Sequence, residues 1–360
     1  MAVLEAAPAD GDTVTALADQ VRRAAAAETP LRIVGGDTKA FYGRRTEGGE
    51  PLSVAGHRGI VAYDPSELVV VARAGTPLAE IEAAVAANGQ MLAFEPPRLG
   101  AASTIGGVVA AGLAGPRRPF AGAVRDCVLG ATILDGRGQA LRFGGQVFKN
   151  VAGFDAFRLM AGALGCLGVI LEVSLRLAPK PRRETALALE LGAAAARTRL
   201  AELMRGPTPL SGAFHDGARL HVRLSGGEAG VDAAAAALGG EAEELSFWDQ
   251  VRDFAHPALS GDAPLWRLSL PQTATIPAVG DVAAWDWAGA QVWLRTDQPA
   301  EALWTAAAAA GGHATLFRGA GAGAEVFQPL APTVLALHQR LKAAFDPAGV
   351  LNPGRMYAAL

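Results

Sequence analysis

Cysteine is scarce in this sequence, and its scarcity excludes several kinds of metal site. The 360 residues contain two cysteines, Cys127 and Cys166. Two thiols cannot supply the four thiolates of an iron–sulfur cluster or of a cysteine-rich zinc site. Both cysteines have apolar neighbours, so we interpret them as buried, inert thiols in a protein from a reducing compartment. We therefore expect no metal in this chain.

The sequence also lacks an excess of positive charge and long apolar runs. The chain has 32 Lys and Arg against 35 Asp and Glu, a formal net charge of -3, and it has no basic stretch interleaved with aromatic residues. This composition argues against a nucleic acid partner. No stretch of about 18 strongly apolar residues is present, and the first residues, with an acid at Glu5, do not resemble a signal peptide. We expect a cytoplasmic protein that reaches the inner membrane only peripherally, through partners.

The length and the hydrophobic pattern predict an α+β fold in three parts. A chain of 360 residues with 51% hydrophobic residues is long enough for about two domains. We place the first domain at residues 1–180, a smaller α+β domain at 184–330, and a C-terminal helix and tail at 331–360. The boundary follows a period-two strand at 169–177 and lies in the Pro- and Arg-rich segment 179–183.

Local signals predict the main elements of both domains. Cap residues and helical spacing indicate helices at 13–27, 76–88 and 155–163. Residues 96–122 contain too much glycine for a stable isolated helix. β-branched runs and one hairpin signal predict strands at 31–34, 68–72, 127–134 and 139–143, and weaker runs at 186–191, 220–224, 266–270 and 291–294.

Three glycine-containing segments could present backbone N–H groups to an anionic ligand. They are Gly35-Gly36-Asp37-Thr38-Lys39, Ser103-Thr104-Ile105-Gly106-Gly107, and the segment 144–155 around Lys149. Glycine tolerates a positive φ, which lets successive N–H groups converge on a phosphate. Each segment alone is also compatible with an ordinary loop, and Lys149 with a solvated loop residue.

In their order along the chain, these segments resemble the PCMH-type FAD-binding domain of the vanillyl-alcohol-oxidase flavoprotein superfamily. The resemblance covers residues 30–180 and narrows to the FAD-binding E subunits of glycolate oxidases in several longer strings. These strings are His57–Pro65, Ala72–Leu78, Glu95–Pro97, Gly112–Pro119, Gly312–Arg318, Phe345–Pro347 and Leu351–Arg355. The resemblance implies a two-part FAD-binding domain, a cap-like second domain, and a C-terminal tail that returns to the first.

The resemblance also implies roles for individual residues. Gly35 to Lys39 are similar to the pyrophosphate loop, and Ser103 to Gly107 to the segment along the pyrophosphate and the flavin. Gly122, Arg125 and Asp126 resemble the next cofactor-contacting stretch. The full set of expected FAD-binding residues is Gly35, Gly36, Asp37, Thr38, Lys39, Pro96, Ser103, Thr104, Gly106, Gly107, Gly122, Arg125, Asp126, Lys149, Gly168, Val169 and Ile170. Phe154 departs from the family pattern, which has Tyr at this position.

The absence of histidine from certain positions bears most on the chemistry. The pyrophosphate loop has neither His nor Cys, and we interpret the nearest candidate, His57, as a loop residue, so we predict non-covalent FAD. A self-sufficient relative would be expected to carry a His-rich catalytic motif in its second half. The six histidines here show no H-x-H or H-x-x-x-H spacing. We interpret His313 as structural or interfacial, and we assign no catalytic residue.

The resemblance implies an FAD-binding subunit of a multi-subunit glycolate oxidase, which converts glycolate to glyoxylate. Its expected partners are a second FAD-binding, catalytic subunit and an iron–sulfur subunit that takes the electrons. One alternative is a self-sufficient FAD-dependent dehydrogenase of a small 2-hydroxy acid, with Arg117, Arg118 or Lys149 binding the carboxylate. Another is a flavin-poor assembly scaffold. The string Gly319–Gly323 lacks the spacing of an NAD-binding motif.

A subunit should also present an apolar interface patch. Our candidates for such a patch are Trp248, Phe254, Trp285, Trp287 and Trp304, although we favour packing in the helix core for most of them.

Overall fold

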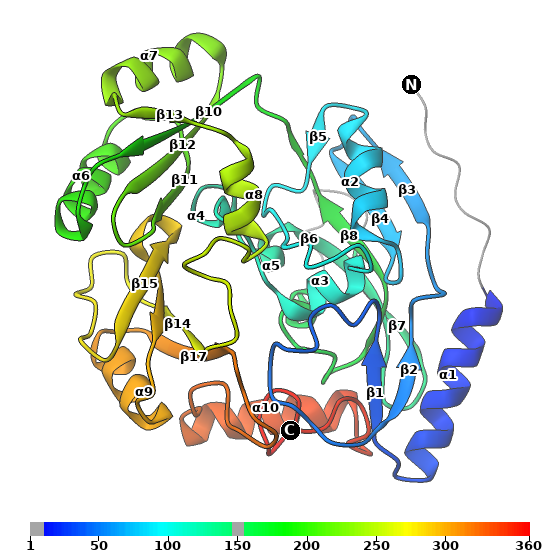
Figure 1. Ribbon diagram of the computed structural model, residues 1–360. Coiled ribbons are helices and arrows are strands. Elements are labelled where there is room, and N and C mark those ends of the chain that lie inside the picture. The colour runs from blue at the N-terminus through cyan, green and yellow to red at the C-terminus, as the bar shows by residue number, and fades with distance from the viewer. Residues whose placement is uncertain (1–10, 146–154) are drawn as a thin grey trace.

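A computed structural model describes residues 11–145 and 155–360 of the chain. In this part the chain builds one five-stranded and one eight-stranded sheet, both antiparallel throughout (Figure 1). The five-stranded sheet has the order β3-β4-β8-β6-β7, and the eight-stranded sheet has the order β13-β10-β12-β11-β15-β16-β14-β17. Two small two-stranded sheets, β1-β2 and β5-β9, flank the first of these. The fold is therefore a mixed α/β fold in two sheet-based parts.

The first part begins with an amphipathic helix and holds the five-stranded sheet. Its strands are β1 (Leu31–Val34), β2 (Glu50–Ser53), β3 (Ile60–Asp64), β4 (Val69–Arg73), β5 (Gln90–Met91), β6 (Val128–Leu134), β7 (Ala140–Gly144), β8 (Val169–Arg176) and β9 (Ala178–Pro179). Its helices are α1 (Gly11–Ala26), α2 (Leu78–Ala86), α3 (Ile105–Ala111), α4 (Arg118–Ala121), α5 (Val124–Cys127) and η1 (Ala156–Met160). The strands expected at 31–34, 68–72, 127–134, 139–143 and 169–177 are all present within one or two residues.

Three expectations for the first part need correction. Strand β8 is buried along nearly its whole length rather than on one face, because α3 packs on it and it lies between β4 and β6 in the sheet. The glycine-rich segment 96–122 does contain a helix, α3, in which Ile105, Val108 and Val109 are buried, so tertiary packing outweighs its low propensity. The expected helix at 155–163 is only the short 3₁₀ turn η1.

The second part is the eight-stranded sheet with four helices. Its strands are β10 (Arg183–Leu189), β11 (Leu210–His215), β12 (Leu220–Gly226), β13 (Glu241–Glu243), β14 (Leu265–Ser269), β15 (Asp281–Asp286), β16 (Gln291–Arg295) and β17 (His313–Arg318). Its helices are α6 (Ala193–Arg205), α7 (Glu228–Leu238), α8 (Ser246–Arg252) and α9 (Ala300–Ala309), and the 3₁₀ turn η2 covers Trp287–Gly289. The four strand runs expected here are β10, β12, β14 and β16; the other four strands were not predicted.

The aromatic candidates for an interface patch are all buried, as we expected for most of them. Each of Trp248, Phe254, Trp285, Trp287 and Trp304 is at most 8% exposed. Trp248 and Phe254 belong to an apolar cluster in which residues of the eight-stranded sheet pack against Tyr42, Leu113 and Leu164 of the first part. They hold the two parts of the molecule together, and any interface patch on the surface must be made of other residues.

The chain returns to its first part at the C-terminus, as expected. Helix α10 (Pro332–Phe345) runs along one edge of the molecule, beneath both parts (Figure 1). The tail then pairs with β1: the Leu31 amide donates to the Val350 carbonyl at 2.7 Å, and the Asn352 amide donates to the Leu31 carbonyl at 3.0 Å. Among residues 11–145 and 155–360, no helix has the length and apolar character needed to cross a bilayer.

Candidate cofactor site

A small cleft lies directly after β1. Its volume is about 100 Å³, and its lining contains the whole predicted pyrophosphate loop, Gly35 to Lys39. Thr104 and Gly107, at the start of α3, form a second wall. Asn352 and Arg355 of the returning tail form a third. The structure thus brings together two of the three predicted glycine segments, although they are more than 60 residues apart in the sequence.

Lys39 is one of the two cations that line this cleft, with Arg355. Its ammonium group donates to the Ser103 hydroxyl at 2.6 Å and forms no ion pair with a carboxylate among the described residues. Burial lowers the pKa of Lys39 from 10.5 to about 8, and a distant charge on Asp253 only partly opposes this. The ammonium also donates to the Thr38 hydroxyl at 3.4 Å. A part-buried ammonium whose partners are neutral hydroxyls is suited to an anion, which would restore the lost solvation.

The glycines of the two loops have a different role from the one that we expected. None of Gly35, Gly36, Gly106 and Gly107 has a positive φ, and the left-handed position in the loop is Asp37, with φ of 53°. A Cβ on Gly36 would lie 1.5 Å from the Ala102 carbonyl oxygen, and a Cβ on Gly106 would lie 2.6 Å from the Cβ of Ala74. These glycines permit close backbone packing between loops. Gly107 has room for a methyl group and faces the cleft.

The C-terminal tail fixes the shape of the pyrophosphate loop. The Asn352 side chain accepts from the Ile33 amide at 2.8 Å and donates to the Leu164 carbonyl at 2.7 Å. The Arg355 guanidinium donates to the carbonyls of Ala40 and Tyr42 at 2.8 and 2.7 Å. The end of the chain therefore holds both ends of a loop that begins more than 300 residues earlier.

A much larger cavity adjoins this cleft at Ala111, which lines both. It has a volume of about 720 Å³, within the usual range for a cofactor pocket. One side is built from α3, α4 and α5 of the first part, and the other from β14, β17 and the tail. The cavity thus lies between the two sheet-based parts.

The cavity is positively charged. Its lining includes Arg118, Arg125, Arg267 and His313 and no acidic side chain. The guanidinium of Arg118 lies 4.1 Å from the ring centroid of Trp287, and that of Arg267 donates to the Tyr42 hydroxyl at 3.0 Å. Partial burial, together with the charges of Arg267 and Arg118, lowers the pKa of His313. At neutral pH His313 is therefore more readily available as a neutral imidazole than a free histidine.

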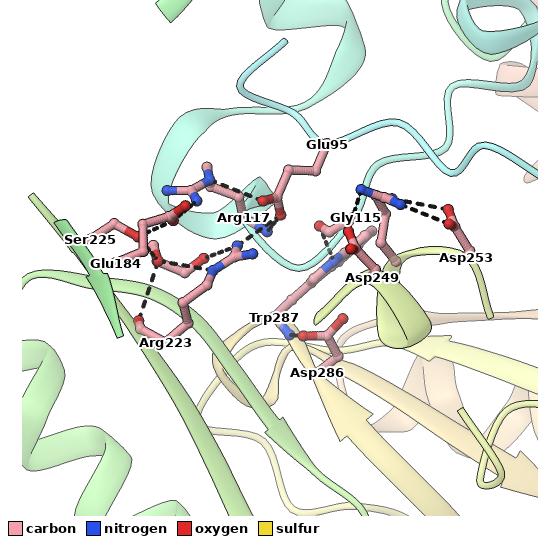
Figure 2. A network of polar contacts seen from close by, with 12 residues as sticks. Glu95, Gly115, Arg117, Glu184, Arg223, Ser225, Asp249, Asp253, Asp286 and Trp287 are labelled. Carbon is pink, nitrogen blue, oxygen red and sulfur yellow. Dashed lines mark hydrogen bonds and ion pairs between the residues drawn. The ribbon is translucent and has the colours of Figure 1, made fainter. Parts of the chain in front are cut away.

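The wall that carries Trp287 is strained. Trp287 and the next residue, Ala288, have φ of 53° and 57°, values that side-chain-bearing residues rarely adopt. The surroundings hold them there: the Asp286 carboxylate accepts from the Trp287 amide at 2.6 Å, and the Trp287 indole donates to the Gly115 carbonyl at 3.0 Å (Figure 2). Strain of this kind tends to occur at functional sites, and here it places the ring beneath Arg118.

Several predicted cofactor residues line neither cavity. Pro96 is buried next to Glu95, and Gly122 forms a turn, with φ of 94°, against Asp126, whose carboxylate accepts from the Ala123 amide. Gly168, Val169 and Ile170 face the core of the five-stranded sheet, where a Cβ on Gly168 would lie 2.8 Å from Ile133. Lys149 and Phe154 lie outside the described residues. Of the described FAD-binding candidates that follow Gly107 in the sequence, only Arg125 lines the large cavity.

Arg117 is not available to a small ligand, because it belongs to a buried ion network. It donates to Glu95 at 3.2 Å and to Glu184 at 2.6 Å, and Arg223 donates to the other oxygen of Glu95 at 2.8 Å (Figure 2). Glu95 and Arg117 belong to the first part of the molecule, and Glu184 and Arg223 to strands of the eight-stranded sheet. Burial alone would raise the pKa of Glu95, but the two arginines outweigh it and hold that pKa below its usual value. The network therefore connects the two parts.

Sequence reasoning missed several residues of the site. Arg267, Tyr42 and Tyr357 line the cavity, and Asn352 and Arg355 hold the loop, but none was singled out as a site residue. Arg267 carried a local signal, since it is a charge within the apolar strand Leu265–Ser269. Asn352 and Arg355 were noted only as part of a matching string.

Comparison with known proteins assigns the family. Residues 9–144 match the model of the FAD binding domain, and residues 289–356 match that of the FAD linked oxidases, C-terminal domain. The chain is 48% identical to glycolate oxidase subunit GlcE of Escherichia coli (strain K12), over 97% of this chain and 99% of that protein. It is 26% identical to glycolate oxidase subunit GlcD of Bacillus subtilis (strain 168), over 87% of this chain and 80% of that one.

Among solved structures, an alkyldihydroxyacetonephosphate synthase matches with a TM-score of 0.64 at 14% identity, over 94% of this chain and 74% of that one. A likeness at this level of identity supports the fold alone. The near full-length match to GlcE carries the assignment: the chain belongs to the FAD-linked oxidases and, within them, to the family of glycolate oxidase subunit GlcE.

Proposed function

We propose that this chain holds FAD non-covalently and acts as a flavin subunit of a multi-subunit glycolate oxidase. The observation that carries the proposal is that the Lys39 cleft adjoins the large cavity and that cations line both spaces. The one acidic residue of these linings, Asp37 in the cleft, is paired with Arg32 at 3.0 Å. An FAD molecule has a diphosphate and a ring system that is anionic when reduced, and it needs a pocket of this charge.

The residues present fit the cofactor. In our proposal Lys39 and the N–H groups of Gly35 to Thr38 and of Gly107 hold the diphosphate, as glycine-rich loops and helix starts do elsewhere. Arg118, Arg125 and Arg267 would face the flavin end in the large cavity. FAD supplies the two-electron acceptor. The chain contributes binding, orientation and positive charge.

Non-covalent attachment stays part of our proposal, because the linings contain only one His or Cys side chain that could bond to a flavin, His313. No cysteine lines the Lys39 cleft or the large cavity. His57 is buried and lines neither of these two spaces. His313 is the one histidine in the wall of the large cavity among the residues described. Denaturation of the purified protein should release the flavin into solution, whereas flavin that stays on the denatured chain would contradict this part of the proposal.

The partners are part of the proposal. Within residues 11–145 and 155–360, no group of three potential ligands is arranged to hold a metal ion, so this part of the chain has no relay for electrons beyond FAD. We propose a second FAD-binding subunit with the catalytic site and an iron–sulfur subunit as the electron acceptor. The motivation is the 48% identity to a protein that is itself named as a subunit.

A self-sufficient dehydrogenase of a small 2-hydroxy acid is the second candidate. One observation favours it: Arg118 and Arg267 could bind a carboxylate in the same cavity in which His313 could accept a proton. The scaffold alternative has no such support, because a scaffold does not need a cationic cavity.

One experiment separates these readings. The purified single chain and the co-purified complex are compared for flavin absorbance, for bleaching by glycolate, and for turnover with an artificial acceptor. We expect flavin in both and turnover only in the complex. Turnover by the single chain at a usual enzyme rate of about 10 s⁻¹ would favour the self-sufficient enzyme, and a chain that does not take up FAD would contradict the proposal.

A further inference from the structure

Helix α10 presents an apolar stripe that the described part of the chain does not cover. Val334, Leu337 and Leu341 follow one another at spacings of three and four residues, so they lie on one side of the helix. Val334 is 41% exposed and Leu337 is 48% exposed, the largest value among the exposed large hydrophobic residues. An amphipathic helix normally buries such a stripe.

The helix is anchored by polar contacts rather than by this stripe. Its one fully buried residue is Lys342, whose ammonium pairs with Asp346 at 2.6 Å and donates to the carbonyls of Cys166 and Leu351. These contacts fix the C-terminal half of α10 against the first part of the molecule. The apolar side chains near its start are therefore available for another contact.

A groove of about 290 Å³ runs beside the stripe. Leu341 and His338 form one wall, and Leu159, which is 41% exposed, lies in the other. The groove is lined by Arg125 and Arg158 and by no acidic side chain. Acids lie beside these cations without lining the groove: Asp155 is 3.0 Å from Arg158 and Asp126 is 3.9 Å from Arg125. Lys342, which also lines the groove, is paired with Asp346 at 2.6 Å. The face thus has an apolar centre beside exposed arginines.

The groove is continuous with the large cavity. Arg125, Ala161, Gly162 and Met356 line both, and Val334 of the stripe lines the cavity. A protein seated on this face would lie next to the flavin end of the proposed cofactor site. An electron acceptor is useful only in that position, and the described part of the chain offers none of its own.

We propose that the face formed by Leu159, Val334, Leu337 and Leu341, with Arg125 and Arg158 at its groove, docks the electron-accepting subunit of the complex. The occupant is an apolar segment of that subunit that carries carboxylates toward the two arginines. A buried apolar centre with a charged rim is the usual design of such interfaces. The inference rests on the proposed function and adds the place of contact.

The test uses the co-expressed complex, with an affinity tag on this chain and the amount of co-purified iron–sulfur subunit as the readout. Leu337→Glu places a charge in the apolar centre, and we expect it to lower that amount about tenfold or more. Arg158→Glu should act in the same direction. Leu245→Glu is the matched control, because Leu245 is 43% exposed but lies at the start of α8, away from this face. It should retain the partner, and flavin content should be unchanged in all three.

Each possible result of this test supports or excludes one occupant of the docking face. Wild-type recovery of the partner with Leu337→Glu, or equal loss with Leu245→Glu, would overturn the docking face. A large fall in the melting temperature of the isolated Leu337→Glu chain would show that the chain covers the stripe itself, and a wild-type single chain that dimerises through Leu337 would assign the face to a second copy. If the wild-type chain recovers no partner while it binds FAD, the multi-subunit proposal itself fails, and the docking inference with it.

Discussion

At the scale of single residues, Lys39 gives the most direct test of the cofactor site. Its ammonium is buried, and its pKa is lowered to about 8. A diphosphate would favour the charged form. FAD affinity should therefore be constant below about pH 8 and should weaken as the pH rises above it, because binding must then take up a proton.

Lys39→Met should weaken FAD binding about 10- to 100-fold, the usual cost of losing a hydrogen bond to a charged group, and should remove the pH dependence. Lys180→Met is the control, since Lys180 is exposed and lines neither proposed FAD cavity. Calorimetric titration with FAD between pH 6.5 and 9.5, roughly the range around that pKa, measures both. A pH-independent wild-type affinity would remove Lys39 from the diphosphate site.

Asp286 is the basis of a second prediction, which concerns the stability of the fold rather than FAD binding. Burial, with help from the Glu95 carboxylate, raises its pKa to about 7. Between about pH 4 and 7 the folded chain keeps a proton that the unfolded chain has released, so this group makes the protein less stable as the pH rises. Asp286→Asn should gain stability relative to wild type between pH 5 and 8, on the order of 1–4 kcal/mol, in thermal denaturation. Asp281→Asn, at an exposed position of the same strand, should show no such gain, and equal pH profiles for wild type and Asp286→Asn would contradict the assignment.

At the scale of elements, substitutions in the two glycine loops can distinguish a role in packing from a role in ligand contact. A methyl group on Gly36 would meet the Ala102 carbonyl at 1.5 Å, whereas one on Gly107 would meet only the Thr104 hydroxyl at 3.4 Å. Gly36→Ala should therefore lower the free energy of unfolding of the FAD-free chain by about 1–3 kcal/mol and also weaken FAD binding. Gly107→Ala should leave stability unchanged and weaken FAD binding alone. Unfolding curves and FAD titrations of both variants check this, and a stable Gly36→Ala chain would show that the loops are not packed as described.

The same elements show how much could be read from the sequence. Strands such as β4 and β6 were predictable because β-branched runs and a hairpin signal are local. The glycine segment that follows β1 could be found for the same reason, and its role in pyrophosphate binding stays a prediction. The cavity could not, because Tyr42, Arg118, Arg267 and His313 come from four segments that are far apart in the sequence and meet only through strand pairing and the packing of the two parts. Helix α3 was missed because its stability comes from Ile105 and its neighbours in the core rather than from propensity.

At the scale of the whole molecule, the ion network decides whether the two sheet-based parts unfold together. Glu95 is the centre of the network, since Arg117 and Arg223 both donate to it. Glu95→Ala leaves two buried guanidinium groups without their shared carboxylate, which should cost about 3–5 kcal/mol. Glu82→Ala is the control, because its pair with Arg98 is more exposed than the Glu95 network, and loss of such a pair should cost at most about 1 kcal/mol.

The positions of the tryptophans allow a loss of coupling between the two parts to be measured by fluorescence. All six tryptophans lie between Trp248 and Trp304, in the part built on the eight-stranded sheet. Tryptophan fluorescence therefore follows that part alone, while far-ultraviolet circular dichroism follows both. In wild type and in Glu82→Ala the two signals should change together with denaturant, as expected for a cooperative unit. In Glu95→Ala they should separate, because the first part loses its ionic link to β12 and keeps only the Arg117–Glu184 pair with β10, while each part keeps its own apolar core. Coincident transitions in Glu95→Ala would show that the apolar cluster around Trp248 and Phe254, rather than the ion network, couples the two parts.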